Sequence, residues 1–116
     1  MDNQKFQIIL DSLLKGSEAG NLEWKPTAIS NVYLLALKDS SISIIKLAEG
    51  FIKLEFRNER GSIAEEVEVY GSEYATAQEN YIKANKLFDL ARRKATNADE
   101  TIDRILKQLN PDSIAA

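Results

Sequence analysis

The sequence predicts an α+β protein with consecutive strands in the middle of the chain and helices at both ends. Near the N-terminus, apolar residues recur at helical spacing. The middle then alternates apolar and polar residues in short runs separated by turn signals, and the last third returns to helical spacing. Because the turns are too short for crossover helices, we expect a four-stranded antiparallel meander with the helices packed on one face.

The chain has the size and composition of one folded domain. It contains 116 residues, of which 44% are hydrophobic and 28% are charged. Folded domains most often contain roughly 100–150 residues, and this apolar fraction is too high for a disordered chain. We therefore expect residues 1–116 to form a single domain.

The first element is expected to be a helix over residues 3–15. Its apolar side chains share one stripe of the helix: Phe6, Ile9, Leu10, Leu13 and Leu14. Gly16 is a plausible left-handed stop. The stretch from Gly16 to Pro26 is expected to be a loop, from which Trp24 returns to the core.

Four strands are expected next, over residues 31–38, 41–48, 51–57 and 62–70. In the third strand Lys53, Glu55 and Arg57 alternate with apolar residues, which predicts one buried and one solvated face. The second strand shifts its apolar parity at Ile44–Ile45, which suggests a bulge there or burial on both faces. Glu65 falls on the apolar parity of the fourth strand, so it lies at the strand edge or a bulge turns it outward.

A long helix is expected over residues 73–95. Aromatic residues and alanines alternate along it at spacings of three and four, which is a heptad seam. The seam consists of Tyr74, Ala77, Tyr81, Ala84, Phe88, Ala91 and Ala95. Two interpretations stay open: the seam packs inside the protein, which we favour, or it forms a subunit interface.

The last helix is expected over residues 97–109. Asn97 and Glu100 resemble a capping box, and Pro111 follows the end of the helix. Its apolar stripe consists of Ala98, Ile102, Ile105, Leu106 and Leu109. With the preceding helix it completes the predicted order of helix, four strands, helix and helix.

The composition excludes several chemistries. The chain has no cysteine and no histidine, which removes disulfides, thiolate zinc sites, a cysteine nucleophile and imidazole as base or ligand. No glycine-rich phosphate loop and no nucleophile elbow occurs. We therefore expect a protein that is not an enzyme, with no catalytic residue, no cofactor and no metal.

The sequence contains two clusters of like charge, one acidic and one basic. Glu65, Glu66 and Glu68 could hold Mg²⁺ or Ca²⁺ or act as an acid–base pair, but charge that protects a strand edge is the favoured explanation. The bases Arg92, Arg93 and Lys94 lie in the last turn of the long helix, where they complement the helix dipole. Contact with phosphate, RNA or an acidic partner is the alternative for these bases.

The formal net charge of −3 argues against general nucleic-acid binding. The charge is uneven along the chain. From Glu49 to Glu79 the acids outnumber the bases by eight to three, and from Lys83 to Lys107 the bases outnumber the acids by seven to four. These two regions could attract each other within one chain or between chains.

A family resemblance rests on four short segments of the chain. They are Leu22–Trp24, Leu87–Ala95, Asp99–Glu100 and Ile105–Leu109. They are similar to small uncharacterised bacterial proteins with a tryptophan-containing loop, a strand meander and a closing helix pair of the LxxLARRxA type. The resemblance spans most of the chain and implies a bacterial origin. It implies no activity and no functional residue.

These observations favour a small interaction or regulatory module that acts by protein–protein contact, as a homodimer or with an unidentified protein partner. The candidate interaction surface combines part of the heptad seam with the adjacent bases: Tyr74, Ala77, Tyr81, Ala84, Phe88, Ala91, Arg92, Arg93 and Lys94. The alternative is a ligand- or nucleic-acid-binding protein that uses the sheet face, Trp24 and the basic helix. No membrane-length apolar run and no signal peptide is visible, so we expect a cytoplasmic protein.

Overall fold

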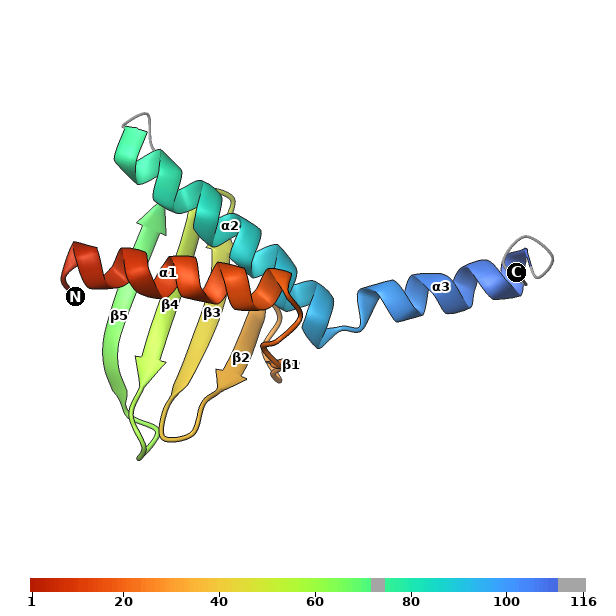
Figure 1. Ribbon diagram of the computed structural model, residues 1–116, viewed down its shortest axis with the longest axis horizontal. Coiled ribbons are helices and arrows are strands. Elements are labelled where there is room, and N and C mark those ends of the chain that lie inside the picture. The colour runs from red at the N-terminus through yellow and green to blue at the C-terminus, as the bar shows by residue number, and fades with distance from the viewer. Residues whose placement is uncertain (72–74, 111–116) are drawn as a thin grey trace.

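The computed structural model describes residues 1–71 and 75–110, apart from the side chains of residues 75–77. Figure 1 shows a helix, a sheet and two further helices in chain order, which confirms the predicted α+β class. The helices are α1 (Asn3–Glu18), α2 (Ala75–Ala95) and α3 (Ala98–Leu109), and the strands are β1 (Trp24–Pro26), β2 (Val32–Ala36), β3 (Ser41–Ala48), β4 (Phe51–Arg57) and β5 (Ile63–Tyr70).

The described part of the chain forms one antiparallel sheet in which the strands are neighbours in chain order, β1-β2-β3-β4-β5. The meander is therefore confirmed, but it has five strands and not four. The additional strand, β1, lies in the segment that the sequence predicted as a loop. It pairs with β2 through Trp24 opposite Leu35 and Pro26 opposite Tyr33.

Trp24 explains why this polar segment joins the sheet. Its side chain is 1% exposed, which confirms that it returns to the core, and its indole N–H donates a hydrogen bond of 3.0 Å to Ser17 Oγ. A buried indole N–H needs such an acceptor, because an unpaired donor is costly to bury. Burial of this ring draws the backbone of β1 alongside β2.

The first helix is longer than predicted, because Gly16 lies inside it and the stop is at Gly20. Gly20 has φ +75°, the left-handed conformation that glycine adopts easily. The N–H of Asn21 donates to the carbonyl of Gly16 and the N–H of Gly20 to that of Ser17, which is the Schellman ending. A Cβ on Gly16 would lie 2.8 Å from Leu22, so packing explains this glycine.

Two bulges adjust the sheet. The pairing of β3 with β4 shifts between Lys46 and Ala48, a few residues after the predicted parity change. The pairing of β4 with β5 shifts after Phe56, which leaves Ala64 unpaired and places Glu65 opposite Phe56. The bulge falls just before Glu65 but does not turn it outward, because Glu65 stays on the same side as Val67 and Val69. The other explanation fits, since β5 is an edge strand of the sheet.

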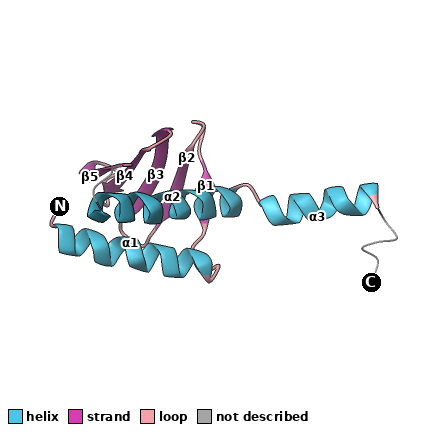
Figure 2. Ribbon diagram, turned by 90° about the horizontal axis from the view of Figure 1, so that it is seen from above, coloured by secondary structure: helices cyan, strands magenta, loops and turns pink. Residues whose placement is uncertain are grey.

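Helices α1 and α2 lie side by side on one face of the sheet, and the other face has no helix among the described residues (Figure 2). The core lies between these two layers. Its buried apolar residues are Phe6, Leu10, Leu13, Leu14, Trp24, Leu35, Ile42, Ile44, Ile52, Leu54, Val69, Ala84, Leu87, Phe88 and Ala91.

The prediction that both C-terminal helices pack on the sheet holds for α2 and is wrong for α3. In Figure 1, α3 extends away from the sheet, and none of its residues is buried. The two-residue connection from α2 directs it outward instead of back over the strands. Within residues 1–71 and 75–110, no helix combines the length and the hydropathy needed to cross a membrane.

Candidate interaction surface

No other described part of the chain covers the apolar stripe of α3. Its four large side chains, Ile102, Ile105, Leu106 and Leu109, are between 40% and 70% exposed. They share one side of the helix because they lie at spacings of three and four or next to each other. An isolated helix of fewer than about 12–15 residues is marginal in water, and α3 has 12. A helix of this length is expected to need a packing partner.

The direction of α3 is set by its junction with α2. Asn97 has φ 50°, so the helical path is interrupted there. The carbonyl of Arg92 accepts hydrogen bonds from the Thr96 N–H at 3.0 Å and from the Thr96 hydroxyl at 2.7 Å. Arg93 pairs with Asp99 across the break. The predicted capping box is wrong, because Asn97 in this conformation makes no side-chain capping bond.

A second apolar surface is a groove of about 370 Å³ between α1 and the hairpin end of the sheet. Six of its ten lining residues are aliphatic or aromatic, and the other four are three serines and Arg57. On the helix side it is lined by Ile8, Ile9, Ser12 and Leu13, and on the sheet side by Leu37, Ser40, Ser41, Ile42, Phe56 and Arg57. Two of these side chains are strongly exposed, Ile8 at 60% and Leu37 at 46%.

The described part of the predicted seam on α2 faces the sheet. Ala84, Phe88 and Ala91 are buried in the protein's own core, which is the internal packing that the sequence favoured. Tyr81 packs against that core, and its Oη accepts a hydrogen bond of 2.9 Å from the backbone N–H of Gly50. These side chains are therefore occupied by contacts within the chain. Tyr74 and the Ala77 side chain lie outside the described residues.

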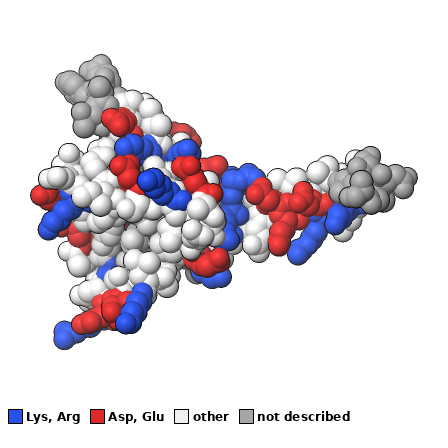
Figure 3. Space-filling model, in the orientation of Figure 1, with Lys and Arg blue, Asp and Glu red and all other residues white. Residues whose placement is uncertain are grey.

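The three bases at the end of α2 each have an acidic partner. Arg92 pairs with Asp89 at 2.7 Å, Lys94 pairs with Glu23 at 3.3 Å, and Arg93 pairs with Asp99 as described. Figure 3 shows acidic and basic side chains interspersed over this face of the molecule. Because phosphate recognition relies on a clustered positive field, this arrangement gives little support to nucleic-acid binding.

The helix-free face of the sheet carries a charged network centred on Glu55. The sequence predicted this residue to be solvated, but it is 8% exposed, because Lys53 and Arg57 lie on either side of it. Its carboxylate lies 3.1 Å from the Arg57 guanidinium and 3.6 Å from the Lys53 ammonium. Arg57 also donates to Ser43 Oγ at 2.9 Å. The network satisfies its own charges, which explains how a glutamate is tolerated there.

The three glutamates of β5 do not converge. Glu66 lies 3.7 Å from Lys53, whereas Glu65 is on the helix side of the sheet, 3.3 Å from the N-terminal amine. Among the described residues, no three histidine, cysteine, aspartate or glutamate side chains group as a metal site would require. The charges lie along a strand at the edge of the sheet, where they discourage pairing with another edge.

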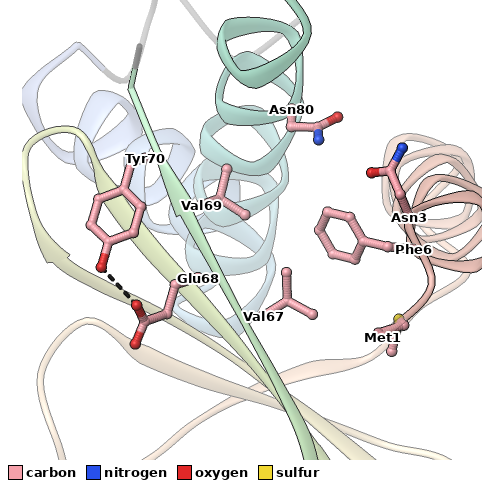
Figure 4. Close-up of a pocket in the computed structure, with 8 residues that line it drawn as sticks. All are labelled: Met1, Asn3, Phe6, Val67, Glu68, Val69, Tyr70 and Asn80. Atoms are coloured by element: carbon pink, nitrogen blue, oxygen red, sulfur yellow. Dashed lines mark hydrogen bonds between the residues drawn. The ribbon is translucent and has the colours of Figure 1, made fainter.

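A hollow of about 400 Å³ lies beside β5 at the N-terminal end of α1. Figure 4 shows Phe6, Val67 and Val69 together on one side of the strand, whereas Glu68 and Tyr70 project on the other side. The Tyr70 hydroxyl donates a hydrogen bond of 2.6 Å to Glu68. Asn3 and Asn80 also line the hollow, so polar and apolar side chains share its wall.

Among the described residues, Tyr70 and Lys83 have shifted pKa values. The hydrogen bond to Glu68 raises the pKa of Tyr70 above its ordinary value of 10.0, because the protonated phenol is the donor. The hydrogen bond to Asp11 raises the pKa of Lys83, and the charges of Asp11 and Glu79 act in the same direction. In both cases the largest cause is a hydrogen bond to one neighbouring carboxylate, Glu68 for Tyr70 and Asp11 for Lys83.

No protein-family model, no curated protein and no solved structure matches this chain. The spacing of apolar residues predicted the stripe of α3, and we expected that stripe to pack on the sheet. The sequence contained no signal for the groove, because residues from α1, β3 and β4 that are far apart in the chain line it together.

Proposed function

We propose that the protein is a non-enzymatic interaction module that acts by protein–protein contact and self-associates as a homodimer through α3. The observation that carries the proposal is the exposed stripe of Ile102, Ile105, Leu106 and Leu109 on a helix that packs on nothing in its own sheet. Burying one aliphatic side chain completely contributes about 1.5–3 kcal/mol. Four half-exposed ones therefore represent roughly 4 kcal/mol per helix that no other described part of the chain supplies and that a partner could.

The alternative, a ligand- or nucleic-acid-binding protein, has less support. It depended on Trp24, on the sheet face and on the bases of α2. Trp24 is buried, the sheet face carries a charge network that is already paired, and each of the three bases has an acidic partner. A contact through apolar surface fits these observations better.

Light scattering coupled to size-exclusion chromatography, over a range of micromolar concentrations, tests the proposal. We expect the mass of a dimer at high concentration. Ile105→Gln removes one side chain from the stripe, and Lys107→Gln makes the matched change on the opposite side of the same helix. We expect Ile105→Gln to weaken the dimer at least tenfold and Lys107→Gln to leave it within twofold, since about 1.4 kcal/mol corresponds to a factor of ten.

Circular dichroism of both variants checks that they are folded. A monomeric protein at every concentration would refute the homodimer, and equal effects of the two substitutions would show that the stripe of α3 is not the contact.

A further inference from the structure

We infer that α3 of one copy occupies the groove between α1 and the sheet of a second copy, and that the two copies exchange these helices reciprocally. The inference rests on the proposed self-association and specifies which surfaces meet. Its two halves are the uncovered stripe of α3 and the groove lined by Ile8, Leu37 and Phe56. Both are apolar, both are exposed, and both belong to the same chain.

The position of the groove suits a helix. In Figure 1, α1 crosses the sheet, and beyond it the ends of β2, β3 and β4 near their hairpins have no helix above them among the described residues. Ile42 and Phe56 come from this part of the sheet, and Ile9 and Leu13 come from the adjoining side of α1. A helix laid in this corner would contact α1 on one side and the strands below, as helices in two-layer α+β folds do.

The charges beside the two surfaces are complementary. On α3, helical periodicity places Asp99 and Asp103 along one flank of the stripe, while the other flank carries the uncharged Thr101 and Gln108. On α1, Lys5 lies one turn before Ile8 and Lys15 one turn after Ser12, so both lysines border the groove.

The lysines beside the groove are available for such a contact. Lys5 and Lys15 are exposed and have no ion-pair partner among the described residues, and the same is true of Asp103 on α3. An α3 with its stripe in the groove and its acidic flank toward α1 brings opposite charges together. The turn of Ser40 and Ser41 then faces the uncharged flank.

The required contact area favours exchange over a pairing of two α3 helices. A helix of 12 residues is about 18 Å long, and a stable dimer buries about 800 Å² on each partner. Two α3 helices against each other offer only their stripes. Reciprocal exchange engages two helices and two grooves, and it closes as a dimer around a two-fold axis instead of growing into a filament.

Thiol crosslinking tests the inference directly, because the natural chain has no cysteine. Three single-cysteine proteins are prepared: Ile105→Cys on α3, Ile8→Cys on the helix wall of the groove and Leu37→Cys on its sheet wall. Ile105→Cys carries a mass tag and is mixed with each groove variant before a short bifunctional maleimide is added. A fourth variant, Glu49→Cys, places the thiol in the exposed turn at the opposite end of the strands.

We expect Ile105→Cys to form crosslinked heterodimers with Ile8→Cys, with Leu37→Cys or with both. The yield of these heterodimers should be at least five times the yield of the heterodimer with Glu49→Cys. Predominant crosslinking of Ile105→Cys with itself would show that two α3 helices pair, and it would overturn the inference. A third outcome is that no crosslink forms between copies, but that the double variant Ile8→Cys/Ile105→Cys forms a link within one chain. This outcome would show that α3 packs into its own groove, and it would also overturn the inference.

Light scattering of the unmodified protein separates the two proposals. If the protein is a monomer, the homodimer and the exchange both fail. If it is a dimer and the groove thiols do not crosslink with α3 of another copy, the exchange alone fails and self-association stands. Circular dichroism of each cysteine variant confirms that the thiols are presented by a folded protein.

Discussion

Trp24 shows how one side chain positions a short strand. The ring is almost fully buried, and its N–H reaches the hydroxyl of Ser17 in the last turn of α1. This contact links the end of the first helix to the first strand, across the loop that separates them. Local sequence indicates burial of the ring, but the acceptor depends on where α1 ends.

We expect Ser17→Ala to lower the free energy of unfolding by about 1–3 kcal/mol, because the buried indole N–H loses its acceptor. Urea denaturation followed by tryptophan fluorescence measures the change. Ser62→Ala, at an exposed serine in the turn between β4 and β5, is the control and should change the free energy by less than about 0.5 kcal/mol. Equal effects of the two substitutions would contradict the role of the hydrogen bond.

Tyr70 provides a prediction about pH. Its pKa is raised above 10.0 by the hydrogen bond to Glu68, and a pKa raised in the folded state stabilises the fold below the unfolded value. This contribution is lost as the pH rises above 10.0 and through the pKa of the folded state. We expect Glu68→Gln to lower the pKa of Tyr70 toward 10.0, as measured by the ultraviolet absorbance of tyrosinate.

Tyr70→Phe identifies the signal of this residue by removing it. If the wild-type protein and Glu68→Gln titrate identically, the hydrogen bond does not control the ionisation of Tyr70.

Glu55 is the residue whose burial depends most on its neighbours. We expect Arg57→Ala to lower the free energy of unfolding by about 1–3 kcal/mol, because it leaves a nearly buried carboxylate with only Lys53 beside it. In the double variant Glu55→Gln/Arg57→Ala the loss should be smaller, since the charge that needs a partner is gone. A double-mutant cycle by urea denaturation measures this coupling. Additive effects would show that the pair contributes nothing.

At the scale of elements, α2 and α3 are two helices with one heptad phase. Ala91, Ala95, Ala98 and Ile102 continue the alternation of spacings of four and three across the junction. The sequence is therefore compatible with one long helix, and the left-handed conformation of Asn97 divides it. Asparagine tolerates this conformation better than most residues, so its identity directs α3.

We expect Asn97→Ala to favour a continuous helix, because a left-handed conformation costs an ordinary residue roughly 1–2 kcal/mol. Asn97→Gly should keep the break. Spin labels on Lys86→Cys and Lys107→Cys report the distance between the two helices by pulsed electron paramagnetic resonance. The label distance should change in Asn97→Ala and stay constant in Asn97→Gly. The same distance in both variants would mean that Asn97 does not direct α3.

At the scale of the whole molecule, the uneven charge of the sequence is neutralised mainly by contacts within the chain. Lys83 pairs with Asp11, Lys86 with Glu18, and Lys94 with Glu23, so the bases of α2 meet acids from the N-terminal part. From the acidic middle, Glu79 also pairs with Lys83, at 3.5 Å. Lys5 and Lys15 of α1, which border the groove, have no ion-pair partner among the described residues.

We expect the double reversal Lys5→Glu/Lys15→Glu to weaken the dimer about tenfold, because it places acids opposite the acidic flank of α3. Adding Asp103→Lys should restore part of the affinity. Sedimentation equilibrium at low and moderate salt measures both effects, which should shrink as salt screens the charges. A reversal without effect at low salt would contradict the proposed orientation of α3 in the groove.

Much of the architecture could be predicted from the sequence. Periodicity identified each helix and the four longer strands, because a stripe or an alternation records which side of an element is buried. Turn residues separated the strands. The interior position of Ala84 and Phe88 was the favoured interpretation of the heptad seam. The explanation that a bulge turns Glu65 outward was wrong, because the bulge at Ala64 leaves Glu65 on the helix side of the sheet.

The apolar stripe of α3 could be predicted from the sequence, but its exposure to solvent could not. Periodicity shows that a helix has an apolar side, and it cannot show whether the same chain supplies the surface that covers it. That depended on the junction at Asn97. The burial of Glu55, the pairing of β1 and the groove beside Ile8 likewise depend on residues far apart in sequence.

The sequence by itself thus determined the class of fold, the amphipathic elements and the absence of thiol and imidazole chemistry, since each follows from local spacing or composition. Only the tertiary structure decided that α2 turns its seam toward the sheet, that α3 projects with its stripe uncovered and that an apolar groove lies beside α1. The reason is physical: side chains encode the sidedness of an element, whereas contacts between distant segments select what that side meets.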